Sequence, residues 1–167
     1  MGPAGQQGSE SATAGTAGVI TRPPLLYFAC LILGLVLDRL LPLPLALSDA
    51  ASAWRTAGGV LILFGVAIFA AGIRNFSRAS TPVPTTQSVR ALVTAGIHGW
   101  TRNPIYVGMF ALYLGIGLAA RSPWTIILLL PLAIIMRCGV VAREEAYLER
   151  RFGDAYRDYK RRVRRWL

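Results

Sequence analysis

Four long runs of apolar residues, separated by shorter polar stretches, dominate the chain. They cover about Leu25 to Leu41, about Trp54 to Phe76, about Pro104 to Ala120 and about Trp124 to Val141. Roughly 20 apolar residues in a helix are enough to cross the hydrocarbon core of a bilayer. Proline suits the first turn of a helix but cannot continue one, so Pro42 and Pro44 end the first run and Pro104 begins the third. The pattern predicts an all-α integral membrane bundle of four transmembrane helices.

A different periodicity follows the last run. Apolar and aromatic residues recur there at helical intervals, while arginines fill the other faces. The stripe consists of Leu148, Phe152, Tyr156, Tyr159, Val163 and Trp166. We therefore expect a C-terminal amphipathic interfacial helix, with its aromatic rings at the level of the lipid headgroups. Gly153 suits a helix end and Asp154 a helix start, so the two are expected to break this helix.

The first residues form a separate region of the sequence. Residues 1–18 are mainly Gly, Ala, Ser, Thr and Gln, which cannot bury enough surface to order themselves, and we expect a disordered tail. They lack the basic segment of a signal peptide, so no cleavage is expected. At 167 residues the chain has the length of one domain, and residues 19–167 are expected to form it.

Composition agrees with a membrane location. Apolar residues make up 54% of the chain and charged residues 16%, against about 25% charged residues in soluble domains. The net charge of +10 is concentrated beside an apolar run, since ten of the 18 basic residues are Arg137 or lie between Arg143 and Arg165. Clusters of this kind bind anionic lipid headgroups. This distribution argues against nucleic acid as a partner.

The basic residues also predict an orientation. With four spans, one side of the membrane holds both termini and the loop 77–103, with fourteen basic residues. The other side holds only Arg39, Arg55 and Arg121. By the positive-inside rule both termini lie in the cytoplasm, so we expect a multi-pass protein of the cytoplasmic (inner) membrane.

Few residues are available for metal or redox chemistry. Cys30 and Cys138 each lie inside an apolar run, where single thiols behave as small hydrophobic side chains. His98 is the only histidine, which argues against a histidine-based metal site. We expect no metal. His98 is a candidate general base near neutral pH, although a loop histidine without a catalytic role is the simpler interpretation.

The candidate chemistry begins where the polar loop meets the third run. A helix that starts at Pro104 offers unpaired N–H groups to an anion, and Arg102 can bind a carboxylate through two hydrogen bonds. The ring of Tyr106 can contact an adenine, or a sulfonium through a cation–π interaction. The alternative is a membrane anchor, because Arg and Tyr are common at bilayer surfaces.

Two adjacent carboxylates end the fourth run. Glu144 and Glu145 are costly at the end of an apolar helix unless they are paired or functional. Either can accept hydrogen bonds from ribose hydroxyls or from an ammonium group. Arg137 precedes Glu144 by two helical turns, so the two are expected to share a face, as part of a site or as a structural ion pair.

Two blocks of sequence resemble a family of membrane methyltransferases that use S-adenosylmethionine, the isoprenylcysteine carboxyl methyltransferase and phospholipid methyltransferase group. The first block is Leu92-Val93-Thr94-x-Gly96 followed by Arg102-Asn103-Pro104-x-Tyr106-x-Gly108. The second runs from Glu144-Glu145 through Phe152-Gly153 to Arg165-Trp166. The match covers about residues 76–166. Asn103 stands where the family often has histidine, and His98 stands where it often has tyrosine.

The resemblance implies a pocket for S-adenosylmethionine on the cytoplasmic face and a lipid or small amphipathic methyl acceptor that arrives from the membrane. The expected catalytic residues are Arg102 and Glu145. The expected cofactor-binding residues are Leu92, Val93, Gly96, His98, Asn103, Pro104, Tyr106, Gly108, Arg137, Glu144 and Glu145. The isoprenylcysteine enzymes have additional spans that this chain lacks, which argues against a prenylcysteine acceptor.

The sequence thus favours an S-adenosylmethionine-dependent methyltransferase, and two alternatives stay open. One is a sterol-reductase-like NADPH oxidoreductase. Those proteins typically carry Cys-x-x-Lys-Tyr-Gly-x-x-Trp, whereas this chain has Leu148 and Arg151 in place of the cysteine and the lysine, which argues against it. The other is a non-enzymatic membrane scaffold that binds anionic lipid.

Overall fold

The computed structural model describes residues 22–43, 51–83 and 89–167, and these residues form helices joined by loops. The helices are α2 (Pro23–Leu40), α3 (Ala51–Arg78), η1 (Gly96–Gly99), α4 (Pro104–Ala119), α5 (Pro123–Ile135), η2 (Met136–Val141), α6 (Ala142–Phe152) and α7 (Asp154–Arg162). Within the described ranges the only β-structure is an isolated bridge between Thr101 and Arg164. The all-α prediction is confirmed. The predicted tail, 1–18, lies outside the described residues.

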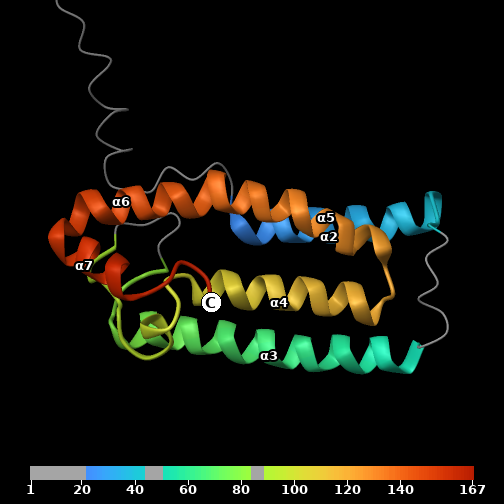
Figure 1. The fold of residues 1–167 in the computed structure, drawn as a ribbon, viewed down its shortest axis with the longest axis horizontal. Helices are drawn as coiled ribbons and strands as arrows, with labels where there is room; N and C mark the ends of the chain where they lie inside the picture. Colours follow the sequence, from blue (N-terminus) through green and yellow to red (C-terminus); the bar gives the residue numbers. More distant parts are fainter. Residues whose placement is uncertain (1–21, 44–50, 84–88) are drawn as a thin grey trace, which may run out of the picture.

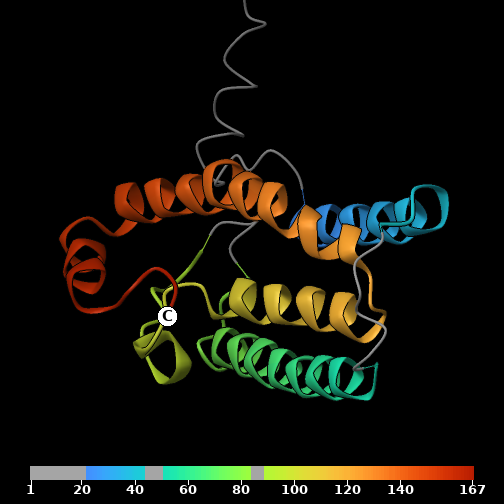
Figure 2. The same ribbon diagram turned by 45° about the vertical axis from the view of Figure 1, so that its right-hand side comes forward.

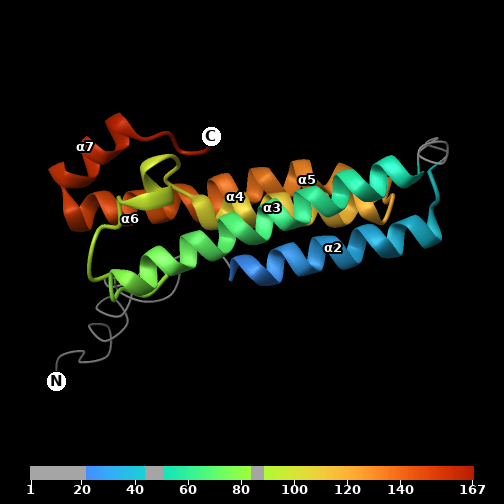
Figure 3. The same cartoon turned by 90° about the horizontal axis from the view of Figure 1, so that it is seen from below.

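The bundle has two layers, each made of two helices. α3 packs along α4 in one layer, and α2 packs along α5 in the other (Figures 1 and 2). α5 continues through the π-helical segment η2 into α6 without a break, so Pro123–Phe152 is a single long helix. α6, α7 and η1 gather at one end of the bundle, which we call the polar end (Figures 1 and 3).

The α3–α4 layer depends on glycines at the crossing of the two helices. A Cβ atom on Gly65 would lie 2.8 Å from the backbone oxygen of Gly108, and one on Gly108 would lie 2.8 Å from the oxygen of Gly65. Backbones this close leave no room for a side chain at either position. Small residues bring helices together in this way in lipid, where packing drives association. Gly108, expected in the cofactor pocket, therefore packs against α3.

The end opposite the polar end is held by one carboxylate. Asp38 of α2 accepts hydrogen bonds from the hydroxyl of Ser122 and, at 3.3 Å, from the backbone N–H of Trp124. Ser122 is also the N-cap of α5, accepting a hydrogen bond from the N–H of Thr125 at 3.1 Å. The indole N–H of Trp124 donates to the carbonyl of Leu41 at 2.7 Å. These contacts fix the start of α5 to the end of α2.

Helix lengths relate the bundle to a bilayer. Within the described ranges, three helices are long and apolar enough to cross a membrane, namely Pro23–Leu40, Ala51–Arg78 and Pro123–Phe152. α4 has 16 residues and rises only about 24 Å, less than the hydrocarbon core of about 30 Å. Glu144 lies about 31 Å along the helix axis from Pro123. If α5 begins at one surface of the core, the two glutamates lie at the other.

The C-terminal helix differs from the expectation in one respect. It is broken at Gly153, whose φ of 54° is the left-handed region that favours glycine, and this confirms the predicted break. The stripe residues Tyr156 and Tyr159, expected among lipid headgroups, are instead buried in the protein. The partner of Tyr159 comes from η1, because the hydroxyl of Tyr159 donates to the carbonyl of His98 at 2.6 Å.

A large side chain at the glycine crossing should destabilise the bundle. We expect Gly65→Leu to lower the free energy of unfolding by about 1–3 kcal/mol or more, because its side chain meets the backbone of α4. The measurement is the thermal unfolding midpoint in detergent. Gly59→Leu is the matched control, since a Cβ on Gly59 meets no atom within 4 Å. Equal midpoints for the two variants would contradict the proposed packing.

Candidate active site at the polar end of the bundle

The polar groups of this end come from segments that are distant in sequence. They belong to the loop 89–103, the first turn of α4, the helices α6 and α7, and the residues after α7. α4 can begin at Pro104 because proline suits the first turn of a helix. The buried hydroxyl of Thr101 accepts a hydrogen bond from the N–H of Asn103 at 3.3 Å, which shapes the chain just before the helix.

Glu145 is the centre of the site. Its carboxylate lies 3.0 Å from Nη2 of Arg102, and both side chains are less than a tenth exposed. Arg165 binds the same carboxylate through two hydrogen bonds, from Nε at 3.1 Å and from Nη2 at 2.5 Å. This contact raises the pKa of Arg165 above its usual value. A buried carboxylate held by two guanidinium groups is the arrangement that makes burial of charge tolerable.

Glu144 has a different partner. The hydroxyl of Tyr106 donates to Oε1 of Glu144 at 2.8 Å, and both residues are buried. Tyr106 lies in the first turn of α4 and Glu144 in the first turn of α6, so this bond joins the two helices at the point where they reach the site. The adjacent carboxylates therefore have separate roles, one paired with cations and the other with a hydroxyl group.

The residues after α7 close the site from outside. Arg102 N–H donates to the carbonyl of Arg164 at 2.9 Å. The carbonyl of Arg165 accepts from the hydroxyl of Thr101 at 3.2 Å and from the side-chain amide of Asn103 at 3.0 Å. Asn103 thus holds the C-terminal segment with its amide nitrogen. These bonds hold Arg165 beside Glu145.

His98 is enclosed on every side. The amide of Asn75 donates to Nδ1 of His98 at 3.3 Å, which leaves the ring proton on Nε2, and Phe76 packs edge-on against the ring at 5.0 Å. Burial lowers the pKa of His98 to about 4, so the ring is neutral near pH 7. Burial also raises the pKa of Tyr159 to about 12, so its hydroxyl stays protonated and donates to His98.

The loop before η1 is fixed to α6. The hydroxyl of Tyr147 accepts from the N–H of Val89 at 3.3 Å, and Nε of Arg151 donates to the carbonyl of Val89 at 2.6 Å. Arg90 N–H donates to the hydroxyl of Thr81 at 2.9 Å. Leu92 and Val93 of this loop border the same cavity as Glu144 and Glu145 and give it apolar lining.

Two adjoining cavities, of about 50 Å³ and about 30 Å³, lie between these segments. Both are bordered by Phe76, His98, Arg102, Asn103 and Glu144. Nε of Arg102 is buried at this site and has no hydrogen-bond partner. An unsatisfied donor on a buried cation is costly, so it marks a place where an anionic or carbonyl oxygen would be stabilised.

Most of the predicted site residues come together here. Those that border the two cavities are Leu92, Val93, His98, Arg102, Asn103, Pro104, Tyr106, Glu144 and Glu145. Gly96 lies beside them without bordering a cavity. Its φ is +59° and a Cβ there would meet the amide of Asn75 at 2.7 Å, so it forms the turn that positions His98.

Arg137 is a correction to the prediction. It was expected to share a face with Glu144, but it is exposed and borders a groove between α3, α4 and α5. The reason is the π-helical segment from Met136 to Val141, which has more residues per turn than an α-helix and changes the facing of everything after it. The partner of Glu144 is Tyr106.

Several residues that border or support the site were not predicted for it. Asn75 and Phe76, at the end of α3, carried no sequence signal beyond their place beside a polar loop. Tyr156 and Tyr159 belonged to the amphipathic stripe, and Arg165 to a basic cluster expected to bind lipid headgroups. A stripe or basic cluster looks the same in sequence whether it contacts lipid or protein.

The long apolar helices indicate an integral membrane protein. Its buried, charged site lies at one end of the helix bundle. The family model for phospholipid methyltransferase matches residues 54–155. The chain belongs to this family of membrane methyltransferases, as its resemblance to the isoprenylcysteine carboxyl methyltransferase and phospholipid methyltransferase group predicted. Arg102, Tyr106, Glu144 and Glu145 all lie in the matched region.

Individual relatives agree with the family. The chain is 35% identical over 130 residues to protein-S-isoprenylcysteine O-methyltransferase from Rattus norvegicus, and equally to the Mus musculus protein of that name, covering 66% of this chain and 40% of each relative. An uncharacterized protein from Haemophilus influenzae is 70% identical over 27 residues, which are 16% of this chain and 43% of that one. The chain thus spans well under half of these relatives' lengths. No solved structure matches.

The buried histidine should make stability depend on pH. Because the pKa of His98 falls from 6.5 in the unfolded chain to about 4 in the folded protein, the unfolded state binds more protons between these values. The free energy of unfolding should therefore fall as pH is lowered through this window, and be unaffected by His98 above it. Unfolding midpoints at a series of pH values should fall less steeply for His98→Gln. Parallel curves would contradict the assignment.

The contact of Arg165 with Glu145 should need a guanidinium group. Arg165→Lys keeps the charge but loses one of two charge-assisted hydrogen bonds, so the free energy of unfolding should fall by about 1.5–3 kcal/mol. Arg164→Lys is the matched control, because that side chain is exposed and its change should stay within about 0.5 kcal/mol. The measurement is chemical or thermal unfolding in detergent. A loss of equal size in both variants would contradict a specific role for the contact of Arg165 with Glu145.

Proposed function

We propose that this protein is an S-adenosylmethionine-dependent methyltransferase that acts on a membrane-soluble or amphipathic acceptor at the cytoplasmic membrane face. The observation that carries the proposal is the buried network of Arg102, Glu145 and Arg165 beside the Tyr106–Glu144 pair. A methyltransferase family model matches the segment that contains four of these five residues. Buried, paired charges at the end of apolar helices are expensive, which favours a function for them.

The donor groups of the site suit this cofactor. The unpartnered Nε of Arg102 would receive the carboxylate of its amino-acid part, and the carboxylates of Glu144 and Glu145 would receive ammonium or ribose hydroxyl donors. Leu92 and Val93 offer an apolar wall for the adenine. The two cavities hold only a few water-sized volumes, so binding requires side chains around them to move apart.

The residues have limited chemistry to perform. S-adenosylmethionine, when bound, supplies an electrophilic methyl group on a sulfonium sulfur. A carboxylate, thiolate or amine acceptor already has a lone pair, so a strong base is not required of the protein. Arg102 and Glu145 would hold the reacting groups in line, and the loop 89–93 would exclude water. Alignment can supply up to about 7–11 kcal/mol of the barrier reduction in ideal cases.

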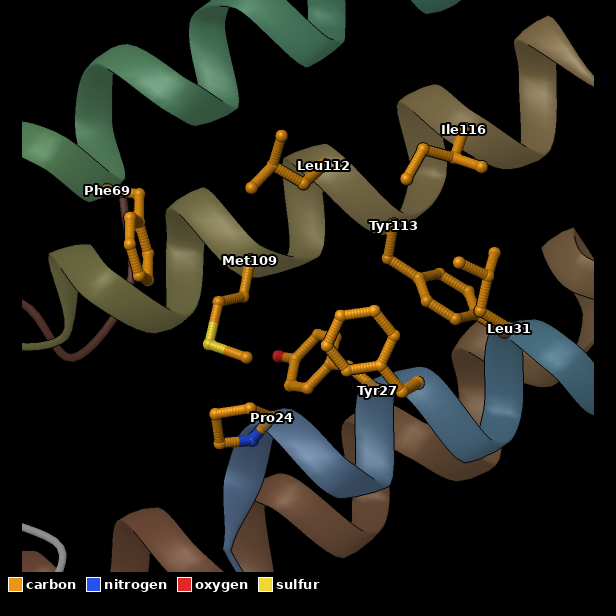
Figure 4. Close-up of a pocket in the computed structure, with 9 residues that line it drawn as sticks. Pro24, Tyr27, Leu31, Phe69, Met109, Leu112, Tyr113 and Ile116 are labelled. Atoms are coloured by element: carbon orange, nitrogen blue, oxygen red, sulfur yellow. The ribbon is translucent and has the colours of Figure 1, made fainter.

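A separate cavity supports the proposed class of acceptor. About 280 Å³ of space lies between α2, α3 and α4, and its walls are almost entirely apolar. Figure 4 shows Met109 and Tyr113 of α4 pointing toward Tyr27 and Leu31 of α2 across it. Tyr27 borders this cavity and belongs to the same buried cluster as Tyr106, whose hydroxyl donates to Glu144. An apolar tail in this cavity would put its head near Tyr106.

The orientation of the site rests on charge. The side that holds the polar end carries fourteen basic residues, against three on the other side. The positive-inside rule then puts the site on the cytoplasmic face, where a water-soluble cofactor can reach it. The four-span arrangement, with the short helix α4 as the third span along the chain, belongs to the same proposal.

Binding of the cofactor tests the proposal. S-adenosylmethionine and S-adenosylhomocysteine should both bind the detergent-purified protein in calorimetry and raise its unfolding midpoint, because a ligand of the folded state stabilises it by mass action. NADPH should do neither. If only NADPH gives a heat of binding and raises the unfolding midpoint, the result would instead favour an oxidoreductase. Absence of binding by all three ligands to folded protein would leave only the scaffold function.

A pair of tyrosine variants tests the site. Tyr106→Phe removes the donor that holds the carboxyl group of Glu144 in place, so S-adenosylmethionine should bind about threefold to tenfold more weakly, as expected for the loss of one hydrogen bond. Tyr113→Phe is the matched control, because the hydroxyl of Tyr113 is buried without a partner. Calorimetry gives the affinities of both variants. Equal affinities would show that Tyr106 and Glu144 have only a structural role.

A further inference from the structure

A second apolar groove lies on the other face of α4. It has a volume of about 590 Å³ and runs between α3, α4 and α5. Its α4 residues Ala111 and Leu114 are on the face opposite Met109 and Ile116, which border the acceptor cavity. The groove and that cavity are therefore distinct, and the groove is open along the outside of the bundle, where lipid would be.

One charged side chain borders this groove, and it is Arg137. All other bordering side chains are apolar or, as for Trp166, aromatic. Among the described residues Arg137 has no ion pair or hydrogen bond, and the nearby glutamates have other partners. A guanidinium in a membrane-spanning helix is costly unless an anion or a polar surface compensates it. The groove therefore combines an apolar channel with an uncompensated cation.

The position of Arg137 along the membrane normal limits which anion can compensate its charge. Arg137 lies about 21 Å along the helix from Pro123, about 9 Å short of the far side of a 30 Å hydrocarbon core. A long arginine side chain covers much of that distance by extending toward the surface. The anions found at this level of a bilayer are lipid phosphates. Trp166 caps the same end of the groove, with its ring edge-on to Phe110 at 5.9 Å, as is usual for aromatics near headgroups.

We propose that this groove binds an anionic phospholipid, with an acyl chain along α4 and α5 and the phosphate on Arg137. Guanidinium and phosphate match each other in charge and in planar, two-bond geometry. A neutral hydrocarbon would fill the groove but leave the charge of Arg137 uncompensated. The site is independent of methyl transfer, so it stands or falls separately from the proposed function.

Wild-type protein gives the first test. In native mass spectrometry from detergent, phosphatidylglycerol should stay bound at lower concentration than phosphatidylcholine, and diacylglycerol, which lacks the phosphate, should bind weakest. This order is expected because only the first lipid brings both a phosphate and a net negative charge. Equal retention of diacylglycerol and phosphatidylglycerol would overturn the proposal.

Variants localise the effect. Arg137→Gln should weaken phosphatidylglycerol binding about tenfold to hundredfold, as expected for a lost charge-assisted contact. Arg55→Gln removes the same charge from an exposed position outside the groove and should bind as wild type does. Ala133→Phe should weaken binding with all charges kept, because it fills the groove. If Arg137→Gln and Arg55→Gln bind equally, or Ala133→Phe has no effect, the lipid binds elsewhere and the proposal is wrong.

Discussion

The whole polar end depends on burying the charge of Glu145. Its carboxylate forms ion pairs with Arg102, just before α4, and with Arg165, beyond α7. This one side chain therefore joins the segment before α4 to the C-terminal segment. Loss of Glu145 would leave two cations side by side, and loss of either arginine would leave a partly uncompensated buried anion. The three groups together carry one positive charge, and Nε of Arg102 has no partner. The network is thus a structural clamp with capacity left for an anionic ligand.

The short helix α4 explains why this clamp is needed. Because α4 rises only about 24 Å, the irregular chain before it begins below the level that a full span would reach. Irregular backbone at such depth is tolerated only when protein satisfies its polar groups. The residues after α7 do this, with the carbonyls of Arg164 and Arg165 accepting from Arg102 N–H and from the side chains of Thr101 and Asn103. Glycine-mediated contact with α3 keeps α4 in place despite its length.

The sequence was sufficient to predict an all-helical fold, and it pointed to residues that the structure brings together at the polar end. Apolar length and proline positions predicted the helices, and the cost of adjacent carboxylates singled out Glu144 and Glu145. The predictions that differ from the structure have one common cause, because the sequence does not say which surface a side chain faces. Gly108 reads as a motif glycine but serves the α3 contact. Tyr156 and Arg165 read as residues of a lipid-facing helix, but they contact protein. Arg137 was misplaced because a π-helical segment has no recognisable sequence signature.

That π-helical segment lets the two halves of one continuous helix, α5 and α6, present different faces to the rest of the protein. An α-helix turns by about 100° per residue, so one extra residue in Met136–Val141 rotates α6 by roughly that angle relative to α5. α5 can therefore face α2 and the lipid as packing demands, while α6 independently turns both glutamates toward α4. Shortening the segment by one residue would leave a perfectly good membrane span, yet it would rotate the carboxylates away from their partners. The site therefore depends on the rotation of α6 about its helix axis more than on the length or apolarity of the helix.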